Sequence, residues 1–115
     1  MIDVNRISKM AYDIAEKRCK HGAFGVHENT VQNLLKHCAG EVVEAMNAFD
    51  DWQENLKFGA DWNKETSKEK FVGELADIIM CALIVAGKMN LDIESAIVAC
   101  GEKNYKRANG NGDKL

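Results

Sequence analysis

Two pairs of acidic residues at helical spacing are the part of this sequence best suited to chemistry. Glu41 and Glu44 form one pair, and Glu74 and Asp77 form the other. Both pairs lie in apolar stretches, where carboxylates are stable only if something compensates their charge. Side chains three residues apart share one face of a helix, so two such helices packed together bring four carboxylates into one place. An all-oxygen cluster of this kind suits Mg²⁺ or Mn²⁺.

Iron is the main competing metal for a cluster of helical carboxylates. Bundles that hold two iron ions use Glu-x-x-His motifs on two helices. No glutamate in this sequence is followed by histidine at that spacing, so the sequence favours Mg²⁺. His37 lies one helical turn before Glu41, where it can donate a hydrogen bond to a carboxylate or to a ligand. A histidine at the border of the core with a local partner is an equally good interpretation.

A basic segment near the C-terminus carries groups that bind phosphate. Lys103 and Arg107 are four residues apart and share a helix face, with Asn104 beside Lys103. Cations near the end of a helix also complement its dipole, which is a purely structural explanation. Next to a cation site we favour a phosphate-binding role, because Lys and Arg bind phosphate oxygens well.

The polar segment between the acidic pairs carries aromatic residues that suit a nucleobase. Trp52, Phe58 and Trp62 lie there among charged residues. A base needs an aromatic or apolar slot, although each ring can also pack back onto the core. Together with His37, we take Trp52 and Trp62 as candidate base contacts.

The pattern of apolar residues predicts an all-α fold. The sequence has no proline and few stretches that alternate with period two. Helical periodicity predicts helices over about 4–20, 29–49, 66–86 and 92–107. Capping boxes at 29–32 and 66–69 are predicted to begin the second and third helices, with a loop at 21–28 and a polar connection at 50–65. A single domain is expected over 1–107, followed by a flexible tail at 108–115.

The third predicted helix indicates an oligomer. It is apolar on nearly all sides between Phe71 and Ala86, and a helix of that kind is buried all round. A helical domain of 115 residues can hardly surround such a helix by itself. We therefore expect a second subunit to cover it.

Composition excludes several classes of protein. The net charge is −3, and the basic residues form no stripe for a nucleic-acid polymer. The longest apolar run, 78–86, is far shorter than the roughly 20 residues that span a bilayer. The N-terminus lacks a signal-peptide pattern, so we expect a cytoplasmic protein without a membrane partner. The four cysteines form no C-x-x-C pair, so the sequence does not favour a zinc site. They are expected to be reduced core residues, with disulfides as the minor alternative; they are Cys19, Cys38, Cys81 and Cys100.

Three segments together resemble the MazG-like nucleotide pyrophosphohydrolases of the all-α NTP pyrophosphatase superfamily. They are G-E-V-V-E-A at 40–45, G-E-L-A-D-I-I at 73–79 and K-N-Y-K-R at 103–107. The resemblance covers roughly 29–107 and implies a four-to-five-helix bundle completed by dimerisation, as a homodimer or a homotetramer built from dimers. It implies magnesium ligands at Glu41, Glu44, Glu74 and Asp77, and phosphate contacts at Lys103, Asn104 and Arg107.

The resemblance implies Mg²⁺-dependent hydrolysis of an NTP or dNTP to NMP and pyrophosphate, which would cleanse nucleotide pools. Glu41 or Glu44 would take the proton of the attacking water. The family pattern often has a further glutamate where this chain has Gly40. Two alternatives stay open: a hydrolase for dUTP, dCTP or phosphoribosyl-ATP, and a catalytically silent dimerisation or regulatory module with a structural Ca²⁺ or Mg²⁺ site.

Overall fold

The described part of the chain is entirely helical in its regular structure. It is a computed structural model that describes residues 2–20 and 30–110, without the side chains of residues 19 and 20. The four helices are α1 (Val4–Lys20), α2 (Val31–Phe58), α3 (Asp61–Lys88) and α4 (Ile93–Ala108). The all-α prediction is therefore confirmed. The predicted loop at 21–28 and most of the predicted tail lie outside the described residues.

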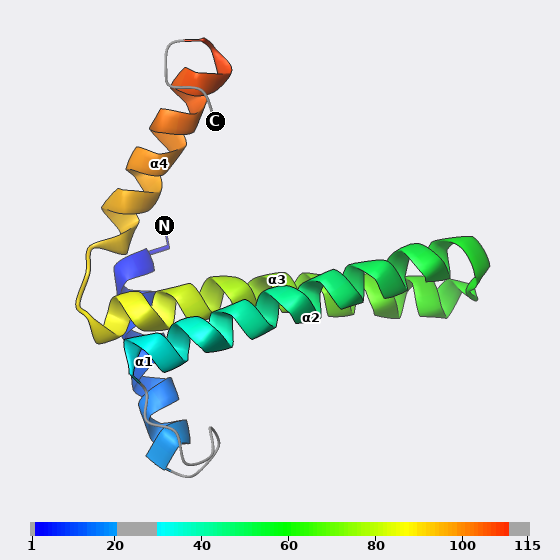
Figure 1. Cartoon of the computed structure of the whole chain (residues 1–115), viewed down its shortest axis with the longest axis horizontal. Coiled ribbons are helices and arrows are strands. Elements are labelled where there is room, and N and C mark those ends of the chain that lie inside the picture. Colours follow the sequence, from blue (N-terminus) through cyan, green and yellow to red (C-terminus); the bar gives the residue numbers. More distant parts are fainter. Residues whose placement is uncertain (1, 21–29, 111–115) are drawn as a thin grey trace.

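A long antiparallel hairpin of α2 and α3 forms the main body of the chain (Figure 1). Helix α1 crosses the hairpin near the end where α3 finishes, and α4 leaves from that end and points away from the hairpin (Figure 1). The radius of gyration is 17.4 Å, whereas a compact chain of this length has about 13 Å. The single chain is thus an open frame, and α4 does not pack into a bundle with α2 and α3.

The hairpin is longer than the sequence predicted. The connection expected at 50–65 is helical over most of its length, because α2 continues to Phe58 and α3 begins at Asp61. The predicted capping box at 66–69 was wrong: Ser67 lies inside α3, where its Oγ donates to the carbonyl oxygen of Asn63 at 2.6 Å. A polar composition does not interrupt a helix whose polar side chains can face solvent.

The two ends of α2 show which local signals set its length. Thr30 is the N-cap, one residue after the predicted cap, and its Oγ1 accepts a hydrogen bond from the Asn33 N–H at 3.1 Å. At the other end the Gly59 N–H donates to the carbonyl oxygen of Asn55 at 2.8 Å. A Cβ on Gly59 would lie 2.8 Å from that same oxygen. Glycine at 59 therefore allows the tight approach that turns the chain into α3.

Small residues allow α1 to cross α3 at close range. The Oγ of Ser8 is buried and donates to the carbonyl oxygen of Leu83 at 2.6 Å. Ala11 and Ala86 are buried as well. A Cβ on Gly87 would collide with the backbone carbonyl of Ser8. The crossing thus depends on the absence of a side chain at 87.

Gly87→Ala is expected to lower the free energy of unfolding by about 1–3 kcal/mol, because the added methyl group forces α1 and α3 apart. Gly101→Ala is the matched control, since nothing lies within 4 Å of a Cβ at 101. There the better helix propensity of alanine should stabilise by up to about 1 kcal/mol. Urea unfolding of both variants checks the contrast. Equal gains in stability at both positions would contradict the close crossing.

The first turns of α1 and α4 cap each other. The Asn5 side-chain amide donates to Asp92 Oδ1 at 2.9 Å, and the Glu94 N–H donates back to Asn5 Oδ1 at 3.1 Å. Asp92 is also the N-cap of α4 and accepts from the Ser95 N–H at 3.2 Å. Just before it, Asn90 has a φ of 54°, a left-handed conformation that asparagine tolerates. These bonds hold the start of α4, whereas α4 has no buried residue in the single chain.

Large apolar side chains remain uncovered over much of the surface. The buried apolar residues are mostly alanines, and Leu34 and Leu83 are the largest of them. The accessible surface is 8632 Å², whereas a compact monomer of this mass exposes about 6,300 Å². None of the helices in the described ranges has the length and apolarity needed to cross a membrane. The exposed apolar residues of α2 and α3 include Val42, Val43, Met46, Val72, Leu75 and Ile79.

Candidate metal centre

The two acidic pairs face each other across the hairpin. One carboxylate oxygen each from Glu41, Glu44 and Glu74 lies within 4.8 Å of the others. Asp77 lies one turn further along α3 and lines a cavity together with Glu41. The antiparallel packing of α2 on α3 therefore brings the four acids into one neighbourhood, as their spacing predicted.

Two oxygen atoms of this acidic cluster are buried without a hydrogen-bond partner. Among the described residues, the buried side-chain atoms in this condition are Glu41 Oε2, Glu74 Oε2 and Arg107 Nε. The Glu41 side chain is only 12% exposed. An unsatisfied buried polar group costs about 1–3 kcal/mol, and more if it is charged. A bound cation would remove that cost, and the all-oxygen donor set fits Mg²⁺.

The electrostatics at Glu41 reflect the same crowding of negative charge. The pKa of Glu41 is raised to about 7, chiefly by burial and next by the interaction with the carboxyl group of Glu44. The negative charges of Asp77 and Glu74 contribute in the same direction. Without a cation, the cluster therefore keeps a proton close to neutral pH.

In metal-free buffer, Glu41 is expected to make the protein less stable as the pH rises. Its pKa is about 7 in the folded chain against an ordinary 4.5, so between these values the folded chain keeps a proton that the unfolded chain releases. The contribution of Glu41 to the free energy of unfolding then falls with rising pH, and the loss is complete above the folded pKa. Urea unfolding in EDTA should show Glu41→Gln gaining stability relative to the parent as the pH rises. A constant difference between the two proteins would contradict this.

A cavity of about 450 Å³ opens beside the cluster. Its wall includes His37, whose Nε2 lies 3.2 Å from Glu41 Oε1, and Arg18 of α1. We did not predict Arg18, because it belongs to no motif and only the crossing of α1 brings it here. Apolar side chains complete part of the lining: Leu34, Met80 and Ile84.

The described cysteines lie in two environments, the packed interior of the hairpin and the surface of α4. Cys81 is buried and Cys38 is half-buried, and both are free thiols. Burial raises the pKa of both thiols, that of Cys81 to about 12, and the neighbouring Cys38 adds to the shift of Cys81. Cys100 is exposed on α4, so the prediction of a core position was wrong for it in the single chain. The side chain of Cys19 lies outside the described part.

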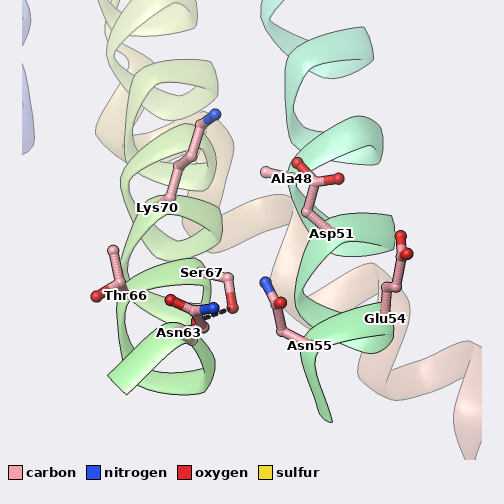
Figure 2. Close-up of a pocket in the computed structure, with 8 residues that line it drawn as sticks. All are labelled: Ala48, Asp51, Glu54, Asn55, Asn63, Thr66, Ser67 and Lys70. Atoms are coloured by element: carbon pink, nitrogen blue, oxygen red, sulfur yellow. Dashed lines mark hydrogen bonds between the residues drawn. The ribbon is translucent and has the colours of Figure 1, made fainter. Parts of the chain in front are cut away.

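A second groove lies further along the hairpin, towards its tip (Figure 2). Its volume is about 380 Å³, and polar side chains of both helices line it. In Figure 2, Lys70 projects from α3 and Asp51 from α2 on the two sides of the groove. Lys70 precedes Glu74 by four residues and shares its helix face. Lys70 therefore brings a positive charge next to the acids, on the same polar face of α3. We did not predict this groove as a site.

The two tryptophans lie in different environments. Trp52 stacks on Phe71 with ring centroids 5.8 Å apart, and its ring meets Phe49 edge-on at 6.3 Å. These contacts tie the two helices together, which is the packing alternative considered for Trp52. Trp62 is 70% exposed and is therefore open to a ligand or to a partner chain.

The basic segment of α4 is not brought to the acids within one chain. Figure 1 shows the C-terminal half of α4 far from the hairpin. Lys103 and Asn104 are exposed there, whereas Arg107 is half-buried. The predicted cation site and the predicted phosphate site are therefore separate in the single chain.

Comparisons of this chain with models of known families, with curated proteins and with solved structures found no match.

Proposed function

We propose that this chain is a Mg²⁺-dependent nucleoside triphosphate pyrophosphohydrolase that works as a homodimer or as a dimer of dimers. One observation carries the proposal: facing acidic pairs converge on buried carboxylate oxygens that have no hydrogen-bond partner. Such a cluster of oxygen ligands suits a hard cation. The motif resemblance at 40–45, 73–79 and 103–107 supports nucleotide hydrolysis as the reaction class.

The acidic residues have two proposed roles, metal binding and proton transfer. Mg²⁺ would be held by Glu41, Glu44, Glu74 and Asp77, and when bound it neutralises phosphate oxygens and orients water. Glu41 is a half-buried carboxylate, and Glu44 is an exposed carboxylate beside it. Whichever of the two is not fully used by the metal could accept the proton of the attacking water.

The substrate would occupy two regions, a cavity beside the acids and a basic segment supplied by the partner chain. The cavity beside Glu41 has about 450 Å³, a volume typical of small-ligand pockets, and its apolar lining suits a nucleobase next to His37. Trp62 lies in the first turn of α3, roughly 22 Å before Asp77 along the helix, so within one chain it does not reach a base in this cavity. Lys103, Asn104 and Arg107 would hold phosphates and stabilise the charge on the departing pyrophosphate.

A second copy of the chain completes the fold and the site. The chain exposes about 2,300 Å² more than a compact monomer of this mass, an area in the range of obligate interfaces. The exposed apolar faces of α2 and α3 are the surface to be covered. Since α4 lies away from the acids of its own chain, we propose that its basic residues reach the acids of the partner chain.

A substrate screen tests the proposed activity. The full chain is incubated with Mg²⁺ and each ribo- and deoxynucleoside triphosphate, and pyrophosphate release is followed. We expect release from at least one triphosphate, and a single strong preference among dUTP, dCTP or another nucleotide would identify a specialised hydrolase. Absence of release from every nucleotide, including phosphoribosyl-ATP, would favour a silent dimerisation module instead.

A further inference from the structure

A second group of potential ligands lies next to the acidic cluster and differs from it in chemistry. His37, Glu41 and Cys81 each place one ligand atom within 4.8 Å of the others. Imidazole and thiol groups are softer donors than carboxylates and suit zinc-like ions, whereas Mg²⁺ prefers oxygen.

The spacing of these atoms matches the ligand shell of a small tetrahedral ion. Zinc bonds to nitrogen, oxygen and sulfur of known length place neighbouring ligand atoms about 3.3–3.8 Å apart. His37 Nε2 and Glu41 Oε1 are already 3.2 Å apart. The remaining separations, up to 4.8 Å, close with small side-chain rotations. Two residues come from α2 and one from α3, so the ion would also clamp the hairpin.

Access from solvent and an unpaired carboxylate oxygen both support an ion beside these three side chains. His37, Glu41 and Cys81 all line the cavity of about 450 Å³, which gives an ion a path to the buried thiol. Glu41 has one buried oxygen without a hydrogen-bond partner. An ion can therefore reach these three side chains through the cavity, and Glu41 offers it an oxygen atom that has no hydrogen-bond partner in the described chain.

We propose that His37, Glu41 and Cys81 form a binding site for a thiophilic divalent cation of the zinc class, with the fourth coordination position open to the cavity. Binding forms a metal–sulfur bond and releases the thiol proton to solvent. Glu41 belongs to both ligand groups, so an ion in this site withdraws it from the magnesium cluster. Zinc would then inhibit the Mg²⁺-dependent reaction, a consequence that rests on the proposed function, whereas the binding itself does not.

Cobalt(II) is the probe of choice because it replaces zinc and reports its ligands by absorption. The full chain is kept reduced and titrated with Co²⁺. A variant with Cys19→Ser and Cys100→Ser serves as the matched background, since it retains the Cys81 thiol of the proposed site and otherwise only Cys38. We expect a thiolate-to-cobalt charge-transfer band and intense visible bands of tetrahedral Co²⁺ in both proteins, saturating at one ion per chain and displaced by Zn²⁺.

Two further variants decide which residues bind the ion. Cys81→Ser in the matched background should lose the charge-transfer band. His37→Gln should keep that band and weaken Co²⁺ binding at least about tenfold, and it serves if the Cys81 variant fails to fold. Weak binding with only octahedral, sulfur-free spectra in the parent, or an unchanged spectrum in Cys81→Ser, would overturn the proposal.

Discussion

Asp77→Asn is expected to lose most of its pyrophosphohydrolase turnover while its helices stay folded. The substitution keeps the shape of the side chain and removes one negative charge from the acidic cluster. If Asp77 is a metal ligand, loss of this charge-assisted contact costs about 1.5–3 kcal/mol, or roughly ten- to a hundredfold in metal affinity. Turnover on the best triphosphate should fall with it, and circular dichroism should show unchanged helix content.

Arg107→Ala provides the contrast to Asp77→Asn. Arg107 carries a phosphate-binding role in the proposal, so its loss should raise the KM for the triphosphate and leave the affinity for Mg²⁺ nearly intact. Metal titrations and steady-state kinetics on both variants separate the two roles. An Asp77→Asn protein that hydrolyses as well as its parent would rule out the metal-centred mechanism.

Heterodimers of the two impaired variants are expected to recover about half of the parent kcat/KM. If the acids of one chain work with α4 of its partner, a dimer with one Asp77→Asn chain and one Arg107→Ala chain has one doubly damaged site and one intact site. This follows from the twofold symmetry of such an interface, where each chain gives to one site what it lacks at the other. Each homodimer should remain impaired at both sites.

Coexpression with two different affinity tags allows the heterodimer to be isolated. Its turnover is compared with that of the parent and of each homodimer, purified in the same way. Heterodimers as impaired as the homodimers would show that each site is built within one chain. Sedimentation at micromolar concentration gives the companion result: the open apolar faces predict a dimer or tetramer and no folded monomer.

The sequence predicted those parts of the fold that depend on local periodicity. Helix α1 has the predicted bounds, and α4 begins at Ile93, one residue after the predicted start. The start of α3 was mispredicted, because Thr66 to Glu69 has the composition of a capping box although the true turn is set by a close contact at Gly59. A contact between backbone atoms at a turn leaves no periodic trace in the sequence.

The candidate site was also predicted only where it depends on local periodicity. The spacing of Glu41, Glu44, Glu74 and Asp77 predicted one shared helix face for each pair, and the hairpin brings these faces together. Arg18 reached the cavity only through the crossing of α1 on α3, which depends on the small residues Ser8 and Gly87. The direction of α4 is set by caps with α1 and not by its own apolar pattern. Long-range geometry of this kind is decided by packing, so single-chain periodicity did not predict it.

The most direct measurement for the central claim is pyrophosphate release by the purified chain with and without a divalent cation. With Mg²⁺, we expect equal amounts of nucleoside monophosphate and pyrophosphate from the preferred triphosphate. Release should stop in EDTA and return when excess Mg²⁺ is added, because the acidic cluster then regains its cation. Release of orthophosphate in place of pyrophosphate, or hydrolysis that continues unchanged in EDTA, would contradict the account.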